Sequence, residues 1–102
     1  YLTNNVPEKA LELAKIVPFE PDQALYVLIY NACASVCTEE AIRYGEELFH
    51  RMPLKYHNDI IVMNSVLHMR MKCGYLTEAE RLFSKLKRMD IITYGVMMNG
   101  YN

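Results

Sequence analysis

The apolar residues of this 102-residue chain recur at helical spacing, in stretches separated by prolines, glycines and capping residues. The first stretch, residues 7–17, follows Asn5 and contains Glu8, a pair typical of an N-terminal capping box. Two prolines end that helix. We predict a second helix over residues 22–34 and a third over 38–52, because each opens on a side chain that can cap the first turn.

The second half of the chain predicts three further helices. The fourth covers residues 61–72 and ends near Gly74, a residue that suits the left-handed conformation after a helix. A capping box at residues 77–80 predicts the start of the fifth, and the sixth is expected to start near Thr93. Two short β-branched runs lead directly into helical patterns, so no strand is predicted. The expected fold class is all-α, with about six short antiparallel helices.

Three aspartates, Asp22, Asp59 and Asp90, mark an internal repeat. The intervals between them are 37 and 31 residues. A bulky side chain follows each one after four positions: Tyr26, Met63 and Tyr94. Repeats of this length cannot bury their apolar faces alone, so neighbouring units stack into a solenoid.

Composition limits the functions that the chain could perform. With 11 basic and 12 acidic residues it lacks the Lys/Arg excess of a general polyanion binder. It has no run of 18 apolar residues, so no membrane span is predicted. Cys33, Cys37 and Cys73 are too few for a disulfide scaffold, so a reducing compartment is expected. The chain starts at Tyr1 without a basic leader, and we expect a longer polypeptide whose targeting segment lies outside it.

Specific residues carry a resemblance to a known repeat family. Residues 60–67 and 71–79 read IIVMNSVL and MKCGYLTEA, which resembles the short (S) form of the pentatricopeptide repeat. Residues 90–101 resemble the opening of a following repeat, and residues 21–45 resemble the long (L) form. The order of unequal repeats is similar to the PLS subclass. The resemblance implies a right-handed α-solenoid divided into residues 1–22 (end of a P repeat), 23–59 (L), 60–90 (S) and 91–102 (first helix of a P repeat).

The resemblance also implies a ligand, single-stranded RNA, read at one base per repeat. In this family the residue after the aromatic position and the last residue of the repeat read the base, which gives Asn64 with Asp90. An amide offers a donor and an acceptor to a base edge, and a carboxylate can orient it. The family links this pair to uracil and, less strongly, to cytosine. The alternatives are a solvent-facing polar residue for Asn64 and an N-cap for Asp90, and the cap can coexist with base reading.

The other units offer weaker reading positions. Val27 and Asp59 occupy the same two positions in the L repeat, but valine has no hydrogen-bonding group and should not discriminate between bases. Gly95 occupies the position in the last unit and can read nothing. Asp22 is the second member of a pair whose first member lies upstream.

The resemblance assigns two further kinds of RNA contact. The second residue of each repeat, which is Ala24, Ile61 or Ile92, is expected to clamp a base from the side. The alternative for the two isoleucines is packing between repeats. Lys72 matches a position near the phosphate backbone, and a solvated lysine is its alternative.

Catalytic and metal sites are not predicted. Cys33 and Cys37 are four residues apart, but no histidine stands at zinc-ligand spacing, and neither H-x-E nor C-x-x-C occurs. We therefore expect no enzyme activity, no cofactor and no metal. The resemblance implies a mitochondrial or chloroplast factor for RNA editing (C-to-U) or RNA processing, whose whole chain can carry a deaminase domain. The alternatives are a tetratricopeptide-like scaffold that binds a peptide, and self-association through exposed repeat ends.

Overall fold

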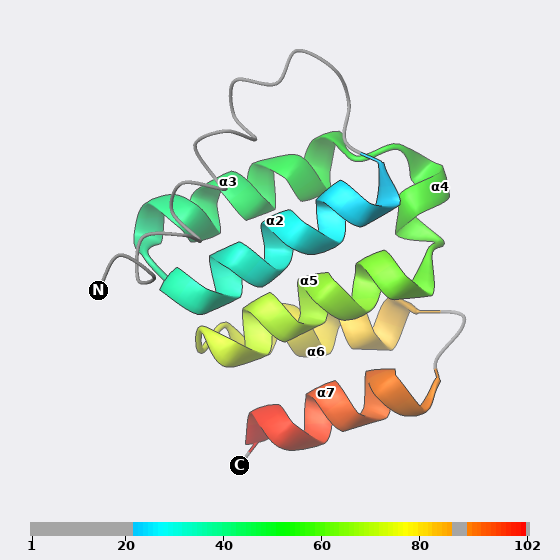
Figure 1. Ribbon diagram of the computed structural model, residues 1–102. Coiled ribbons are helices and arrows are strands. Elements are labelled where there is room, and N and C mark those ends of the chain that lie inside the picture. Colours follow the sequence, from blue (N-terminus) through cyan, green and yellow to red (C-terminus); the bar gives the residue numbers. More distant parts are fainter. Residues whose placement is uncertain (1–21, 87–89, 102) are drawn as a thin grey trace.

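The computed structural model describes residues 22–86 and 90–101, which contain helices and no strand (Figure 1). The helices are α2 (Gln23–Val36), α3 (Glu39–Arg51), α4 (Leu54–His57), α5 (Ile60–Lys72), α6 (Leu76–Lys85) and α7 (Ile91–Tyr101). The predicted all-α class is confirmed. The helix and capping box predicted for residues 5–17 lie outside the described residues.

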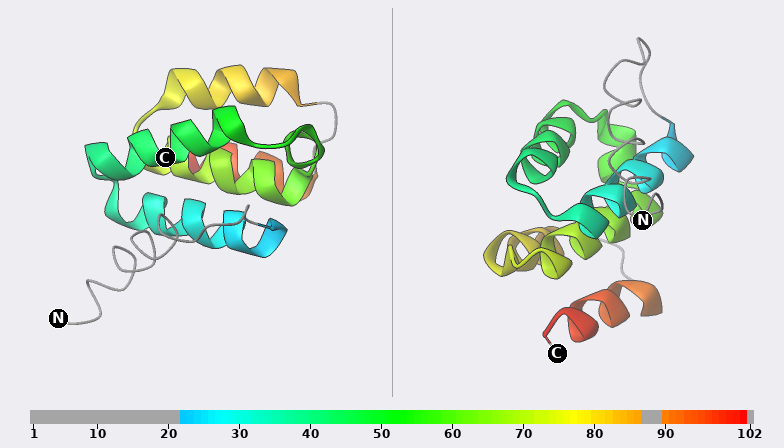
Figure 2. Two further views of the ribbon diagram at one scale, coloured as in Figure 1. Left: turned by 90° about the horizontal axis from the view of Figure 1, so that it is seen from above. Right: turned by 60° about the vertical axis from the view of Figure 1, so that its left-hand side comes forward.

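The helices form two rows. α2, α5 and α7 lie side by side and run in the same direction, with α5 in the middle (Figure 1). α3 and α6 form the second row and run the opposite way, as the left-hand view in Figure 2 shows. The short helix α4, which the sequence did not predict, connects α3 to α5. The first helices of successive units therefore share one side of the molecule.

Side chains cap the helices where the sequence predicts it. The Asp22 carboxylate accepts a hydrogen bond from the Leu25 N–H at 2.9 Å, and the Thr38 hydroxyl accepts one from the Ala41 N–H at 3.1 Å. Asp59 caps α5 by accepting from two N–H groups of its first turn. Each such cap stabilises its helix by about 1 kcal/mol. These interactions fix the starts of α2, α3 and α5.

The start of α6 differs from the prediction. Gly74 has φ of 86° and follows α5 as expected, and the Tyr75 N–H donates to the Arg70 carbonyl at 2.7 Å. This closed turn lets the next helix begin at once, at Leu76, without a side-chain cap. Thr77 lies inside the first turn of α6, so the predicted capping box at residues 77–80 is wrong.

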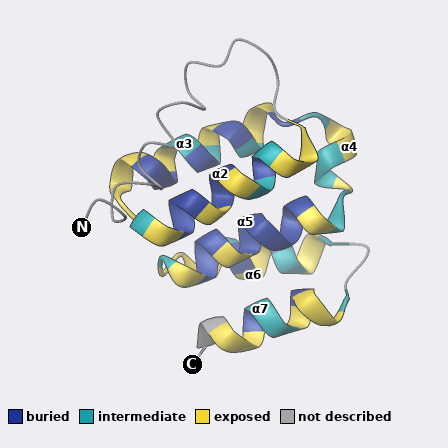
Figure 3. Cartoon of the chain, viewed as in Figure 1, coloured by how far each residue is buried: buried dark blue, intermediate teal, exposed yellow. Residues whose placement is uncertain are grey.

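The core centres on α5. Nine of its thirteen residues are buried, because α2, α4, α6 and α7 all pack against it (Figure 3). α3 and α6 instead bury one face each. Ala79 is completely buried in α6, where α6 packs against α5. The single apolar face that identifies α3 and α6 in the sequence is consequently missing in α5.

A close approach at Gly45 joins three helices. The Tyr30 hydroxyl of α2 donates to the Gly45 carbonyl of α3 at 2.8 Å. Burial, reinforced by the charge of Glu46, raises the pKa of Tyr30 far above its usual range, so this hydroxyl remains a donor. A Cβ at position 45 would lie 2.8 Å from the Met69 sulfur of α5. The glycine lets α3 approach both neighbours.

The cysteines differ from the expectation of free thiols. Cys37 and Cys73 form a disulfide with their Cα atoms 5.3 Å apart, whereas Cys33 is a buried thiol that donates to the Ala41 carbonyl at 3.3 Å. The two bonded residues follow α2 and α5, and they are separated by 36 residues, close to the 37-residue interval between Asp22 and Asp59. The repeat therefore brings equivalent helix ends together, which counting cysteines could not reveal.

Candidate nucleic-acid interface

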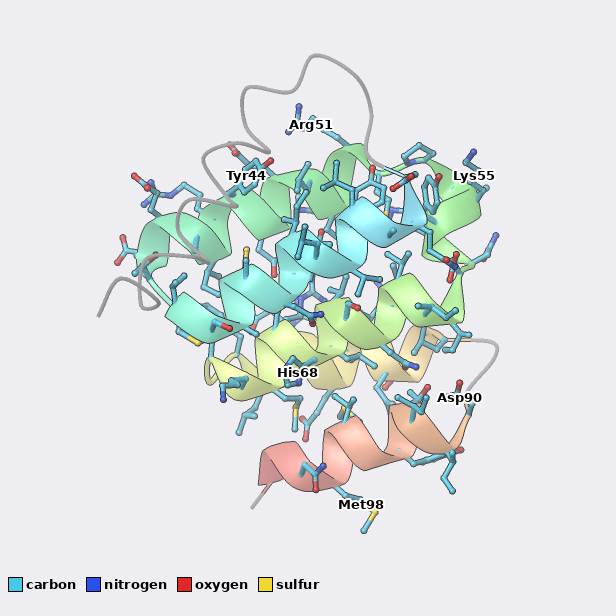
Figure 4. All side chains as sticks on the ribbon, in the orientation of Figure 1. Tyr44, Arg51, Lys55, His68, Asp90 and Met98 are labelled. Carbon is cyan, nitrogen blue, oxygen red and sulfur yellow. A yellow bond between two sulfur atoms is a disulfide. The ribbon has the colours of Figure 1, made fainter. Side chains whose placement is uncertain are left out.

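The predicted reading pair is brought together by the packing of α5 against α7. Asn64 lies in the second turn of α5, and Asp90 lies immediately before α7, where Figure 4 labels it. The Asn64 Nδ2 donates to Asp90 Oδ1 at 3.3 Å. Asn64 is 8% exposed, so the alternative of a fully solvated polar residue is wrong. The two side chains, one on α5 and one immediately before α7, form one polar site.

Thr93 completes this site, and the sequence analysis missed it. Its hydroxyl donates to the Asn64 Oδ1 at 2.6 Å and also lies 2.9 Å from Asp90 Oδ1. Its backbone N–H donates to the same carboxylate oxygen at 2.9 Å. A hydroxyl residue three positions after a helix-capping aspartate was the signal in the sequence.

Hydrogen bonds keep the Asp90 carboxylate charged. The backbone N–H of Thr93 lowers the pKa of Asp90 most, with smaller contributions from the Asn64 amide and the Ile92 N–H. At neutral pH the Asp90 carboxylate is therefore ionised, so it accepts hydrogen bonds and donates none. It caps α7 and contacts Asn64 at the same time, so the cap that the sequence offered as an alternative coexists with this contact.

A polar line continues from Asn64 along α5. His68 and Lys72 follow at intervals of four residues, so the three side chains share one helix face; Figure 4 labels His68. His68 and Lys72 are exposed. Desolvation, with the Lys72 charge second, lowers the pKa of His68 below 6.5, so the imidazole is neutral at pH 7. This line presents an amide, a neutral imidazole and a cation.

The L-unit pair is arranged differently. Val27 is half-buried on α2, and Asp59 precedes α5. The Asp59 Oδ2 accepts from the Gln23 Nε2 at 2.7 Å, while its Oδ1 caps α5. Asp59 thus bonds to Gln23, the first residue of α2, and the valine contributes no polar group.

The predicted clamp residues are accessible. Ile61 and Ile92 are 52% and 61% exposed, and Ala24 is also exposed. The two isoleucines are therefore not enclosed between repeats. Gly95 is half-buried in α7, and Asp22 is an exposed cap of α2.

A separate groove of about 580 Å³ lies over α3, α5 and α6. Arg70, at one wall, is 8% exposed at its side chain and pairs with Glu46 through two hydrogen bonds of 3.0 and 2.7 Å. It also donates to the Glu78 carbonyl at 3.2 Å. None of the predicted RNA contacts lines this groove. We interpret Arg70 as a structural residue that joins three helices.

Two further findings concern the described part of the chain. Within residues 22–86 and 90–101, no three His, Cys, Asp or Glu side chains are grouped as metal ligands. No helix in these segments has the length and apolar character needed to cross a bilayer.

Known proteins similar to this chain share one kind of repeat. A mitochondrial pentatricopeptide repeat-containing protein of Arabidopsis thaliana is 35% identical over 83 residues, which are 80% of this chain and 13% of the relative. Another from the same plant, also mitochondrial, is 32% identical over 103 residues (98% and 16%). The chloroplastic protein DOT4, of the same repeat type and plant, is 32% identical over 106 residues (99% and 12%). No family model matches the chain, and no solved structure matches it.

The chain is homologous to pentatricopeptide repeat-containing proteins. Its predicted resemblance is confirmed at the level of this family. The relatives' names place them in mitochondria or chloroplasts, which confirms the organellar location expected from the sequence. The chain spans only 12–16% of the length of the three relatives described above.

Proposed function

We propose that this chain is a PLS-type segment that binds single-stranded RNA, one base per repeat, and selects the target of an RNA-editing or RNA-processing factor. The segment itself contributes recognition and no chemistry. The observation that supports the proposal most directly is the contact between Asn64 and Asp90, the two predicted reading residues of the S unit. Both residues belong to the S unit of residues 60–90, so this unit has one complete reading pair.

The proposed base at this position is uracil. The free hydrogen of the Asn64 amide and the second lone pair of its oxygen offer one donor and one acceptor to a pyrimidine edge. Ile61 and Ile92, exposed at the start of α5 and α7, hold that base from either side. Lys72 neutralises a phosphate nearby. Val27, in the preceding unit, contacts a base without reading it.

The proposal is tested by changing the reading pair in a longer array that carries this unit. Asn64→Thr should move the preference from uracil toward guanine, and Asp90→Asn in addition should move it toward adenine. Each step should change the discrimination between bases by about 1–3 kcal/mol. Competition binding with RNAs that differ at one base measures it, and Val27→Ala serves as the control that leaves the preference unchanged.

The outcomes separate the proposal from its alternatives. If all four bases compete equally before and after Asn64→Thr, the chain does not read RNA and a peptide-binding scaffold becomes the better account. The isolated chain should bind RNA weakly, no tighter than tens of micromolar, because its net charge of −1 leaves little phosphate neutralisation. Nanomolar binding by the monomer contradicts this expectation, because the affinity would then come from contacts that the proposal does not include.

Self-association is a secondary proposal that rests on α7. Four of its side chains are more than half exposed: Ile91, Ile92, Tyr94 and Met98. We expect this apolar surface to promote end-to-end contact between copies at high concentration. Light scattering that finds only monomers contradicts this proposal and leaves the RNA proposal intact.

A further inference from the structure

The Thr93 side chain is completely buried and is shared between the two reading residues. Its hydroxyl lies 2.6 Å from the Asn64 Oδ1 and 2.9 Å from the Asp90 Oδ1, and it accepts from the Asp90 N–H at 3.2 Å. A hydroxyl has one hydrogen to give, and the shorter contact is the one with Asn64. The amide oxygen of Asn64 therefore has a fixed donor inside the protein.

The other end of the amide is fixed by Asp90. Its carboxylate, which only accepts at neutral pH, faces the Asn64 Nδ2 at 3.3 Å. Turning the amide by 180° would place the amide oxygen against the carboxylate and remove both hydrogen bonds. The two partners together hold Asn64 in one orientation before any ligand arrives.

This orientation matters because uracil and cytosine present opposite groups to an amide. Uracil offers an N3–H donor beside a carbonyl acceptor, whereas cytosine offers an N3 acceptor beside an amino donor. An amide that can turn over matches either base equally well. An amide that is held in one orientation matches one pyrimidine and sets acceptor against acceptor in the other.

We propose that Thr93 is a positioning residue for base selection: it locks the Asn64 amide and so makes this unit distinguish uracil from cytosine. The inference rests on the proposed function and deepens it. The L unit provides a comparison within the chain. There the corresponding residue is Val62, which follows Asp59 by three positions, and the reading position holds Val27, which has no amide to orient.

The test uses the whole 102-residue chain and hexamers of uridine and of cytidine, titrated by NMR. The wild type should prefer oligo(U) by roughly tenfold. Thr93→Val keeps the shape of the side chain and removes the hydroxyl, so the preference should fall to about threefold or less. Thr93→Ser keeps the hydroxyl and should retain the preference. Thr77→Val, at an exposed position of α6, is the matched control and should also retain the preference for oligo(U).

A second measurement does not depend on RNA. In the free wild type, one Nδ2 proton of Asn64 should exchange slowly with water because it is donated to Asp90, and Thr93→Val should accelerate that exchange. If the Asn64 Nδ2 protons of the wild type are not protected from exchange with water, the inference is overturned. This measurement on the wild type tests the inference even if Thr93→Val fails to fold.

The binding outcomes distinguish this inference from the proposed function. A wild type that prefers oligo(U), with a Thr93→Val variant that keeps the same preference, overturns the role of Thr93 and leaves RNA reading intact. A wild type that binds neither hexamer contradicts the proposed function and, with it, this inference. Loss of the preference in Thr93→Val alone supports both.

Discussion

At the scale of single residues, Asp90 shows how one carboxylate joins helix formation to a candidate reading site. Its Oδ1 accepts from the Thr93 N–H, which caps α7, and from the Asn64 Nδ2 of α5. An aspartate before a helix is common for the first reason alone. Only the packing of α5 against α7 adds the second, so the cap was predictable locally and the amide contact was expected only from the family resemblance.

His68 provides a prediction about pH at the same scale. Its lowered pKa leaves the imidazole neutral at pH 7, and protonation as the pH falls below 6.5 adds a positive charge beside Lys72 on the proposed RNA face. We expect RNA affinity to rise by roughly twofold to fivefold between pH 7.5 and 5.5, as for one added cationic contact. Fluorescence anisotropy at constant ionic strength measures this change.

A matched variant isolates the contribution of His68. His68→Gln keeps a polar side chain that does not titrate in this range, so its affinity should change less with pH than that of the wild type. An equal gain in His68→Gln assigns the pH response to other groups and removes His68 from the RNA face.

At the scale of helices, local signals explain most of what could be predicted. The helix starts at Asp22 and Thr38 are predictable because each side chain accepts a hydrogen bond from an N–H group three residues on. The helix end at Gly74 is predictable because glycine readily adopts a positive φ. The true start of α6 was missed because Thr77 looked like a cap, while the turn through Gly74 and Tyr75 set the boundary. Gly74 marks the end of α5 in the sequence, but the residue at which α6 begins does not follow from it.

The pair between Arg70 and Glu46 shows what local signals cannot reveal. The two residues are 24 positions apart and meet only because α3 and α5 pack together. In the sequence, Arg70 looks like a favourable cation near the end of a helix. In the structure its guanidinium is buried, stacks 4.8 Å from the Phe49 ring and donates to both neighbouring helices.

Breaking this pair gives a prediction about helix packing. Glu46→Ala leaves the Arg70 guanidinium buried without its carboxylate, which should lower the free energy of unfolding by about 2–4 kcal/mol. Arg43→Ala removes the exposed ion pair with Glu39 in the same helix and should cost about 0.5 kcal/mol or less. Urea unfolding followed by circular dichroism compares the two variants. Equal losses contradict a joining role for Arg70.

At the scale of the whole molecule, the repeat places equivalent residues next to one another. The first helices α2, α5 and α7 lie in one row, so residues about one repeat apart become neighbours in space. Gln23 and Asp59 meet at one end of this row, and Cys37 and Cys73 meet at the other. The periodicity of the aspartates was visible in the sequence, and extending it to the cysteines would have indicated their pairing.

The disulfide therefore constrains the spacing of the two complete hairpins, and its removal gives the last prediction. It closes a loop across 36 positions, so its reduction should lower the free energy of unfolding by about 2–4 kcal/mol. For a chain of this size that loss corresponds to a fall in Tm of roughly 10–20 °C. Differential scanning calorimetry with and without dithiothreitol measures this fall in Tm.

The double variant Cys37→Ser/Cys73→Ser should start at the lower Tm and show no response to dithiothreitol, which separates the disulfide from general effects of the reductant. Peptide mapping under non-reducing conditions that finds both cysteines as free thiols, together with an unchanged Tm on reduction, contradicts the covalent link between the hairpins.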